Sequence, residues 1–169
     1  MKKLIYLFTL LPLFLSAQVF EQFSDGDFTY NPIWTGDTAE FEISTSTIIP
    51  APLRPALRLK APSGTTGMSY LSTPNTMSIT DSVEWTFWVK LSLNPSSNNN
   101  ARVYLVSDQE NVEGSLNGYY VGIGETNDRL TLCRQNGTNY NILITGTQAN
   151  LNKSSNEVRV KVKKSTSGV

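Results

Sequence analysis

Alternation of apolar and polar side chains is the feature that most restricts the fold of this chain. In VEWTFWVKLSL, residues 83–93, every second side chain is apolar and shares one face. A period of two is typical of a β-strand with one buried face, whereas an amphipathic helix needs apolar residues three or four positions apart. No window of the chain sustains a helical period. The pattern therefore predicts an all-β protein.

The same alternation recurs in shorter runs, which are separated by residues typical of turns. The further predicted strands are AEFEIST (39–45), ALRLK (56–60), ARVYLVS (101–107), GYYVGIG (118–124), RLTLCRQ (129–135), YNILITG (140–146) and EVRVKVK (157–163). Asn136-Gly137, between two of these runs, is a strong hairpin signal. Prolines make residues 48–64 an irregular connection with one short edge strand. Many short strands with one apolar face predict a two-sheet antiparallel β-sandwich.

The first residues have the layout of a secretory signal peptide. Lys2 and Lys3 precede an apolar run, and Ser16-Ala17 supplies the small residues of a cleavage site. The run is too short to span a membrane, which takes ~20 apolar residues. We therefore expect residues 1–17 to be removed, and residues 18–169 to form one β-sandwich domain. The mature protein would be secreted, free or at the cell surface, without a transmembrane segment.

Composition excludes several classes of function. The chain carries 14 basic and 14 acidic residues, and loss of the leader's two lysines leaves a slight acidic excess. Nucleic acid is then a poor partner, because its binding rests on clustered Lys and Arg. The absence of histidine removes His-based catalytic triads and the usual zinc ligands. The single cysteine, Cys133, cannot form an internal disulfide.

The order of the strand segments resembles a known family. SYLSTP, VEWTFWVKLSLNPSSNNNARVYLVSD, LNGYYVGIG and DRLTLCRQNG follow one another in an arrangement similar to concanavalin A-like jelly rolls of the laminin-G type. The likeness is greatest to the N-terminal module of secreted multidomain proteins of Bacteroidota-like bacteria, and it covers roughly residues 20–164. Such jelly rolls usually close with further strands, so the resemblance implies a domain truncated before its last strands and further domains of the same polypeptide.

The resemblance also raises the question of catalysis. Many glycoside hydrolases use this jelly roll, with paired carboxylates on one strand in a Glu-x-Asp-x-x-Glu pattern. Here the central strand has Glu84 alone, and the same-face pair elsewhere is Glu40 with Glu42. Neighbouring acids on a solvated strand are ordinary. We therefore expect no catalysis within this segment.

Side chains out of phase with the core provide the candidate binding residues. On residues 83–93, Trp88 and Lys90 point away from the apolar face, and the same reasoning places Arg102, Tyr104 and Tyr120 outside. If these strands are neighbours, three aromatic rings form a strip with two cationic donors beside it. Sugars stack their C–H faces on such rings. The alternative is that loops cover the rings.

Three aspartates in FSDGDFTYNPIWTGD have two explanations. Asp25, Asp27 and Asp37 could supply oxygen ligands to calcium, the one cofactor that the sequence suggests. Asp-Gly and Asn-Pro pairs are also ordinary turn formers. The segment lacks the spacing of an EF-hand loop, so the turn is favoured.

The sequence therefore predicts a secreted non-catalytic recognition module that binds carbohydrate or a cell-surface glycan. One alternative is a structural or adhesive module that binds an extracellular protein. Another is an accessory domain of a larger secreted hydrolase. The last strand adds one open question, because the face with Glu157, Arg159, Lys161 and Lys163 is either a basic docking stripe or an edge protected by lysines.

Overall fold

The protein is described by a computed structural model covering residues 19–47, 49–51, 53–60, 64, 66–77, 79–80, 82–147 and 150–166. The predicted leader, residues 1–17, lies outside these ranges. The strands are β1 (Thr35–Gly36), β2 (Phe41–Ser44), β3 (Ala56–Leu59), β4 (Leu71–Ser72), β5 (Val83–Leu91), β6 (Ala101–Ser107), β7 (Leu116–Gly124), β8 (Arg129–Gly137), β9 (Asn139–Thr145) and β10 (Asn156–Lys164), with a 3-10 turn, η1 (Thr38–Glu40). All described pairings are antiparallel. The predicted all-β class is confirmed.

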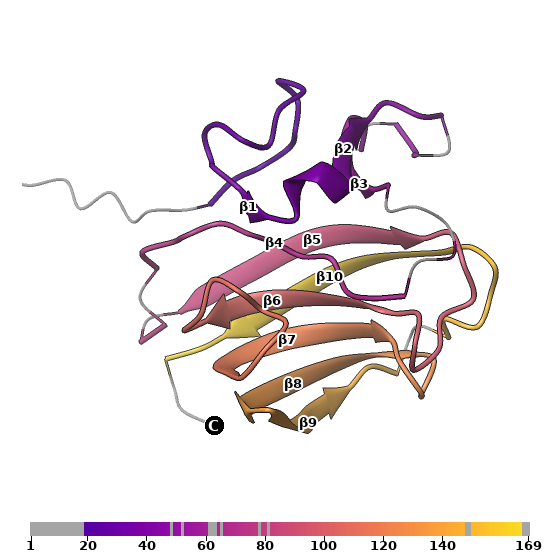
Figure 1. Ribbon diagram of the computed structural model, residues 1–169. Helices are drawn as coiled ribbons and strands as arrows, with labels where there is room; N and C mark the ends of the chain where they lie inside the picture. Colours follow the sequence, from indigo (N-terminus) through magenta and orange to yellow (C-terminus); the bar gives the residue numbers. More distant parts are fainter. Residues whose placement is uncertain are drawn as a thin grey trace, which may run out of the picture.

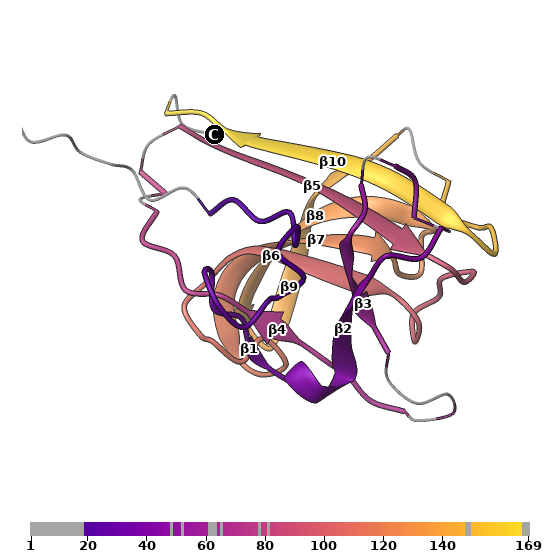
Figure 2. The ribbon, with the colours of Figure 1, turned by 90° about the horizontal axis from the view of Figure 1, so that it is seen from above.

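Two layers enclose the main core. Strands β6, β7, β8 and β9 form one sheet in sequence order, and β5 pairs with β10 as a two-stranded ribbon. Figure 2 shows the β5–β10 ribbon as the outermost layer above this sheet. Between the layers lie the buried side chains of Leu105, Val121, Ile123, Leu151 and Val160. The jelly-roll connectivity itself stays a prediction.

The central predicted strand behaves largely as alternation requires. Trp85, Phe87, Val89 and Leu91 of β5 all pack against the core. The prediction for Leu93 is wrong, since it lies beyond the end of β5 and is 40 % exposed. The physical reason is that pairing with β10 ends where Asn156 meets Leu91.

Shorter pairs accompany the two layers at the N-terminal end of the described chain. β1 pairs with β4, and β2 pairs with β3. Figure 1 shows both pairs together above β5. Strand β3 is the short strand expected within the proline-rich connection of residues 48–64. Within the described residues, no helix is long or apolar enough to cross a membrane.

The β8–β9 hairpin forms where the Asn-Gly signal predicts it, displaced by one residue. Asn136 pairs with Asn139, so Gly137 and Thr138 make the turn, and Gly137 has a φ of +66°. This left-handed conformation suits glycine because it has no Cβ. Strand β9 is the edge of the sheet, and all seven of its residues are exposed. The hairpin thus places β9 side chains beside β8 without covering them.

Candidate functional site

The face of the four-stranded sheet that points away from the core carries a cluster of aromatic and polar side chains. We call it the tyrosine face. Its members come from four neighbouring strands, namely Arg102 and Tyr104 on β6, Tyr120 and Gly122 on β7, Thr131, Cys133 and Gln135 on β8, and Tyr140 on β9. The register places Tyr104 opposite Tyr120, Tyr120 opposite Cys133, and Gln135 opposite Tyr140. Segments that are distant in sequence are therefore held at one place by sheet pairing.

Three tyrosine rings and one guanidinium group pack together on this face. The ring centroids of Tyr104 and Tyr120 are 5.1 Å apart, and those of Tyr120 and Tyr140 are 6.2 Å apart in an edge-on arrangement. The guanidinium carbon of Arg102 lies 5.0 Å from the Tyr120 centroid and 5.8 Å from that of Tyr140. These are favourable geometries for aromatic and cation–π contacts. The rings form an aromatic platform across β6, β7 and β9, in which neighbouring rings are tilted by 40° and 63°. Tyr140 is exposed in this platform, and Tyr120 is buried.

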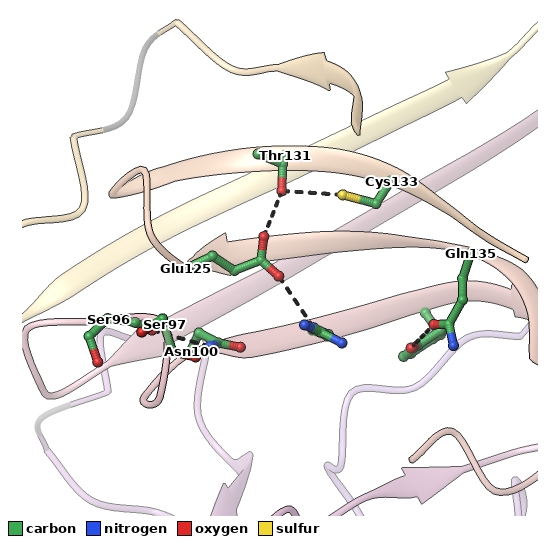
Figure 3. Close-up of polar contacts among 9 residues, drawn as sticks. Ser96, Ser97, Asn100, Glu125, Thr131, Cys133 and Gln135 are labelled. Atoms are coloured by element: carbon green, nitrogen blue, oxygen red, sulfur yellow. Dashed lines mark hydrogen bonds and ion pairs between the residues drawn. The ribbon is translucent and has the colours of Figure 1, made fainter. Parts of the chain in front are cut away.

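A carboxylate balances the charge of Arg102. Arg102 Nε donates to Glu125 Oε1 at 3.3 Å, and Thr131 Oγ1 donates to Glu125 Oε2 at 3.3 Å. Figure 3 shows the Thr131 hydroxyl in contact with both the Glu125 carboxylate and the Cys133 thiol. Gly122 makes room for this carboxylate, because a Cβ there would lie 2.8 Å from Glu125 Cδ and 2.7 Å from Thr131 Oγ1. The side chain of Glu125 is only 14 % exposed.

Gln135 fixes the other end of the tyrosine face. The Tyr104 hydroxyl donates to Gln135 Oε1 at 2.6 Å. Gln135 Nε2 donates to the carbonyl oxygens of Gly114 and Gly137 at 3.1 and 2.9 Å. Burial is the main cause that raises the pKa of the Tyr104 hydroxyl, so it stays protonated and able to donate at neutral pH. This network ties β6 and β8 to the hairpin turn and holds the Tyr104 ring in place.

Tyr120 is the most enclosed member of the cluster. Its side chain is 0 % exposed, and its hydroxyl has no hydrogen-bond partner of good geometry among the described residues. Burial, and then the neighbouring Cys133 thiol, raise the pKa of this hydroxyl far above its ordinary value. The neutral phenol is therefore the form present at physiological pH.

The predicted binding residues divide between two faces of the molecule. The structure brings Arg102, Tyr104 and Tyr120 together, as alternation suggests, although Tyr120 is covered by its neighbours and not exposed. It does not bring Trp88 or Lys90 to them, because both lie on β5, in the other layer. Trp88 Nε1 donates to Glu157 Oε1 across the ribbon at 3.0 Å.

Sequence reasoning missed Glu125, Gln135 and Tyr140. Glu125 follows the last residue of β7 and has a φ of +33°, so strand alternation gives no information on its direction. Tyr140 could have been found from the Asn-Gly hairpin, because a two-residue turn at Asn136-Gly137 places it opposite Cys133. The observed register, displaced by one residue, places it opposite Gln135, and both partners lie on the tyrosine face. The other two need the three-dimensional arrangement.

The outer face of the β5–β10 ribbon concentrates charge around one carboxylate. The ammonium groups of Lys161 and Lys163 lie 2.8 and 3.1 Å from the Glu84 carboxylate oxygens. Hydrogen bonding from Lys161, and then from Lys163, lowers the pKa of Glu84 to about 2. The ion pairs are solvent-exposed, so their contribution to stability is small and salt-dependent.

Replacing Glu84 with glutamine is expected to change how stability depends on pH. Because the folded pKa lies below the ordinary value of 4.5, the stabilising contribution is complete above 4.5 and is lost as the pH falls to about 2. Glu84→Gln should therefore melt below the wild type at neutral pH and at the same temperature near pH 2. Thermal melts across this range test it, and added salt should shrink the difference. An equal difference at both pH values would contradict the prediction.

The three aspartates considered as calcium ligands accept hydrogen bonds that stabilise turns and loops. Asp25 Oδ1 accepts from the Asp27 amide at 3.1 Å, and Asp27 Oδ1 accepts from the Thr29 amide and hydroxyl at 2.7 and 2.8 Å. The Thr29 bonds lower the pKa of Asp27. Asp37 instead accepts from the Tyr70 amide at 3.0 Å. Among the described residues, no group of three or more Asp, Glu, His or Cys could hold a metal ion.

The paired glutamates near β2 also have separate roles. Glu42 forms an exposed ion pair with Arg58 at 3.6 Å, directly across the β2–β3 pair. Glu40 accepts a hydrogen bond from the Ser69 hydroxyl. Each carboxylate is thus engaged with a different neighbour.

Comparison with known proteins gives no relative for this chain. No family model, no curated protein and no solved structure matches it.

Proposed function

We propose that this protein is a secreted, non-catalytic recognition module that binds carbohydrate through the tyrosine face. The observation that carries the proposal is the platform of Tyr104, Tyr120 and Tyr140 with Arg102 packed over it. Aromatic rings stack on the C–H faces of sugars, and a few polar groups at their edge fix the orientation. The leader-like first residues support export.

The polar groups beside the platform are suited to sugar hydroxyls. Arg102 and Glu125 lie at one end, and Gln135 lies at the other. Arginine contributes only donors, whereas a carboxylate contributes only acceptors. A ring with several hydroxyl groups can use both kinds. This complementarity favours binding.

Tyr104→Ala is expected to weaken glycan binding at least about tenfold, equivalent to about 1.4 kcal/mol. The mature protein, residues 18–169, would be screened on a glycan array, and the affinity of any bound glycan measured by calorimetry. Trp88→Ala is the matched control, because it removes an aromatic ring from the opposite layer. Circular dichroism must show that both variants are folded. Equal losses in the two variants, or no glycan bound by the wild type, would contradict the proposal.

A second candidate function is a protein-interaction module. Strand β9 favours it, since Ile142, Leu143 and Ile144 are 45, 50 and 61 % exposed and no residue of the strand is charged. An uncharged sheet edge can pair with a strand of another protein. The array experiment separates the two functions, because a module of this second kind binds through β9 and leaves the glycans unbound.

A further inference from the structure

The unpartnered hydroxyl of Tyr120 is an exception within a well-satisfied cluster. Thr131, Gln135 and Tyr104, its polar neighbours on the same face, all make hydrogen bonds. Buried polar groups are nearly always paired, because an unpaired one loses its bonds to water without compensation. A ligand that forms a hydrogen bond with the Tyr120 hydroxyl would explain this exception.

Tyr140 is the part of the cover that can move most easily. Its ring meets Tyr120 edge-on at 6.2 Å, yet it is 49 % exposed and stands on the edge strand β9. Exposed side chains change rotamer in picoseconds to nanoseconds without a backbone change. Tyr104, in contrast, is held by its hydrogen bond to Gln135. Rotation of Tyr140 therefore removes the part of the cover that β9 contributes, while Arg102 and Tyr104 stay in place.

The charges beside Tyr120 favour an uncharged ligand. Arg102 already has Glu125 as a counter-ion at 3.3 Å, and the Glu125 side chain is only 14 % exposed, whereas that of Arg102 is 38 % exposed. The Glu125 carboxylate would repel an acidic ligand, and the Arg102 guanidinium would repel a basic one. A neutral polyhydroxyl ring meets neither penalty.

We propose that Tyr140 is a lid over the Tyr120 hydroxyl, and that this hydroxyl is the internal anchor for a ring hydroxyl of an uncharged sugar. The proposal rests on the proposed glycan-binding function and specifies its ligand class. Binding displaces the Tyr140 ring, which then stacks on the sugar together with Tyr104. The ligand oxygen takes the place of the missing hydrogen-bond partner.

The lid is tested without any ligand by chemical acetylation of tyrosines and peptide mapping. In the wild type, Tyr120 should react severalfold more slowly than Tyr30, which is 73 % exposed. Tyr140→Ala should raise the rate at Tyr120 severalfold, and Tyr140→Phe, which keeps the ring, should not. Equal rates at Tyr120 in the wild type and in Tyr140→Ala would overturn the lid.

The anchor is tested by the binding of neutral and acidic glycans to Tyr120→Phe. Loss of one neutral hydrogen bond should weaken binding about fivefold, while the melting temperature stays equal or rises because the removed hydroxyl was unpaired. Unchanged affinity in Tyr120→Phe would overturn the anchor and leave glycan recognition standing. Preference for uronate-containing or sialylated glycans would overturn the ligand class. Failure of the wild type to bind any glycan would overturn the anchor together with the proposed function.

Discussion

Ile123→Ala is expected to lower the free energy of unfolding by about 2–5 kcal/mol, the usual cost of truncating a buried isoleucine. Ile123 is 1 % exposed and packs with Val121, Leu105 and Val160, so its loss opens a cavity where the two layers meet. Urea denaturation followed by tryptophan fluorescence measures the change.

Ile144→Ala is the matched control for that substitution. Ile144 is 61 % exposed on β9, so the same truncation should cost no more than about 0.5 kcal/mol. Similar losses at the two positions would mean that the interlayer core is not where we place it.

Gly124→Ala is expected to destabilise the fold by about 2 kcal/mol or more, since strain and overpacking each cost about 1–3 kcal/mol. Gly124 ends β7 with a φ of +97°, a conformation that alanine rarely adopts. An added Cβ would lie 2.3 Å from the Cβ of Pro95, whose ring is buried and stiff. Either β7 or the β5–β6 connection must then shift, and thermal melts would show a lower midpoint.

Gly114→Ala is the comparison for that change. Gly114 has open space around its Cα and no positive φ, so alanine should alter stability by no more than about 0.5 kcal/mol. A Gly124→Ala protein as stable as Gly114→Ala would show that the turn after β7 yields without strain.

Much of the strand content could be predicted from the sequence, because period-two alternation extends over several residues in each long strand. Every run predicted from this alternation overlaps a described strand. The pairing of β1 with β4 could not be predicted in this way, because each of the two strands has only two residues and so shows no period. The end of β5 was misplaced at Leu93, because an apolar residue in phase does not reveal where the partner strand stops.

The candidate site was predicted only in part, for a topological reason. Alternation states which side chains share a face of one strand, but it does not state which strands share a sheet. Trp88 belongs to a ribbon completed by β10, which is far along the sequence, whereas Tyr104 and Tyr120 belong to a meander of consecutive strands. The three rings therefore cannot form the single strip that we expected.

The enclosure of Tyr120 shows a second limit. Its direction follows from its phase in β7, but its cover comes from Arg102, Tyr104 and Tyr140 on other strands. Alternation along a strand tells on which side of the sheet a side chain lies. Whether that side chain is buried or exposed depends on the residues of neighbouring strands. The same holds for β9, whose three consecutive aliphatic residues, 142–144, would suit a buried strand and yet lie exposed at the sheet edge.

The position of Cys133 makes this chain convenient for studying its own unfolding. It is the sole cysteine of the sequence and is 0 % exposed in the middle of β8. A thiol-specific dye can reach it only after the tyrosine face or the sheet has opened, so the labelling rate reports opening at one known position. The native protein therefore contains a built-in probe of local opening that needs no added residue.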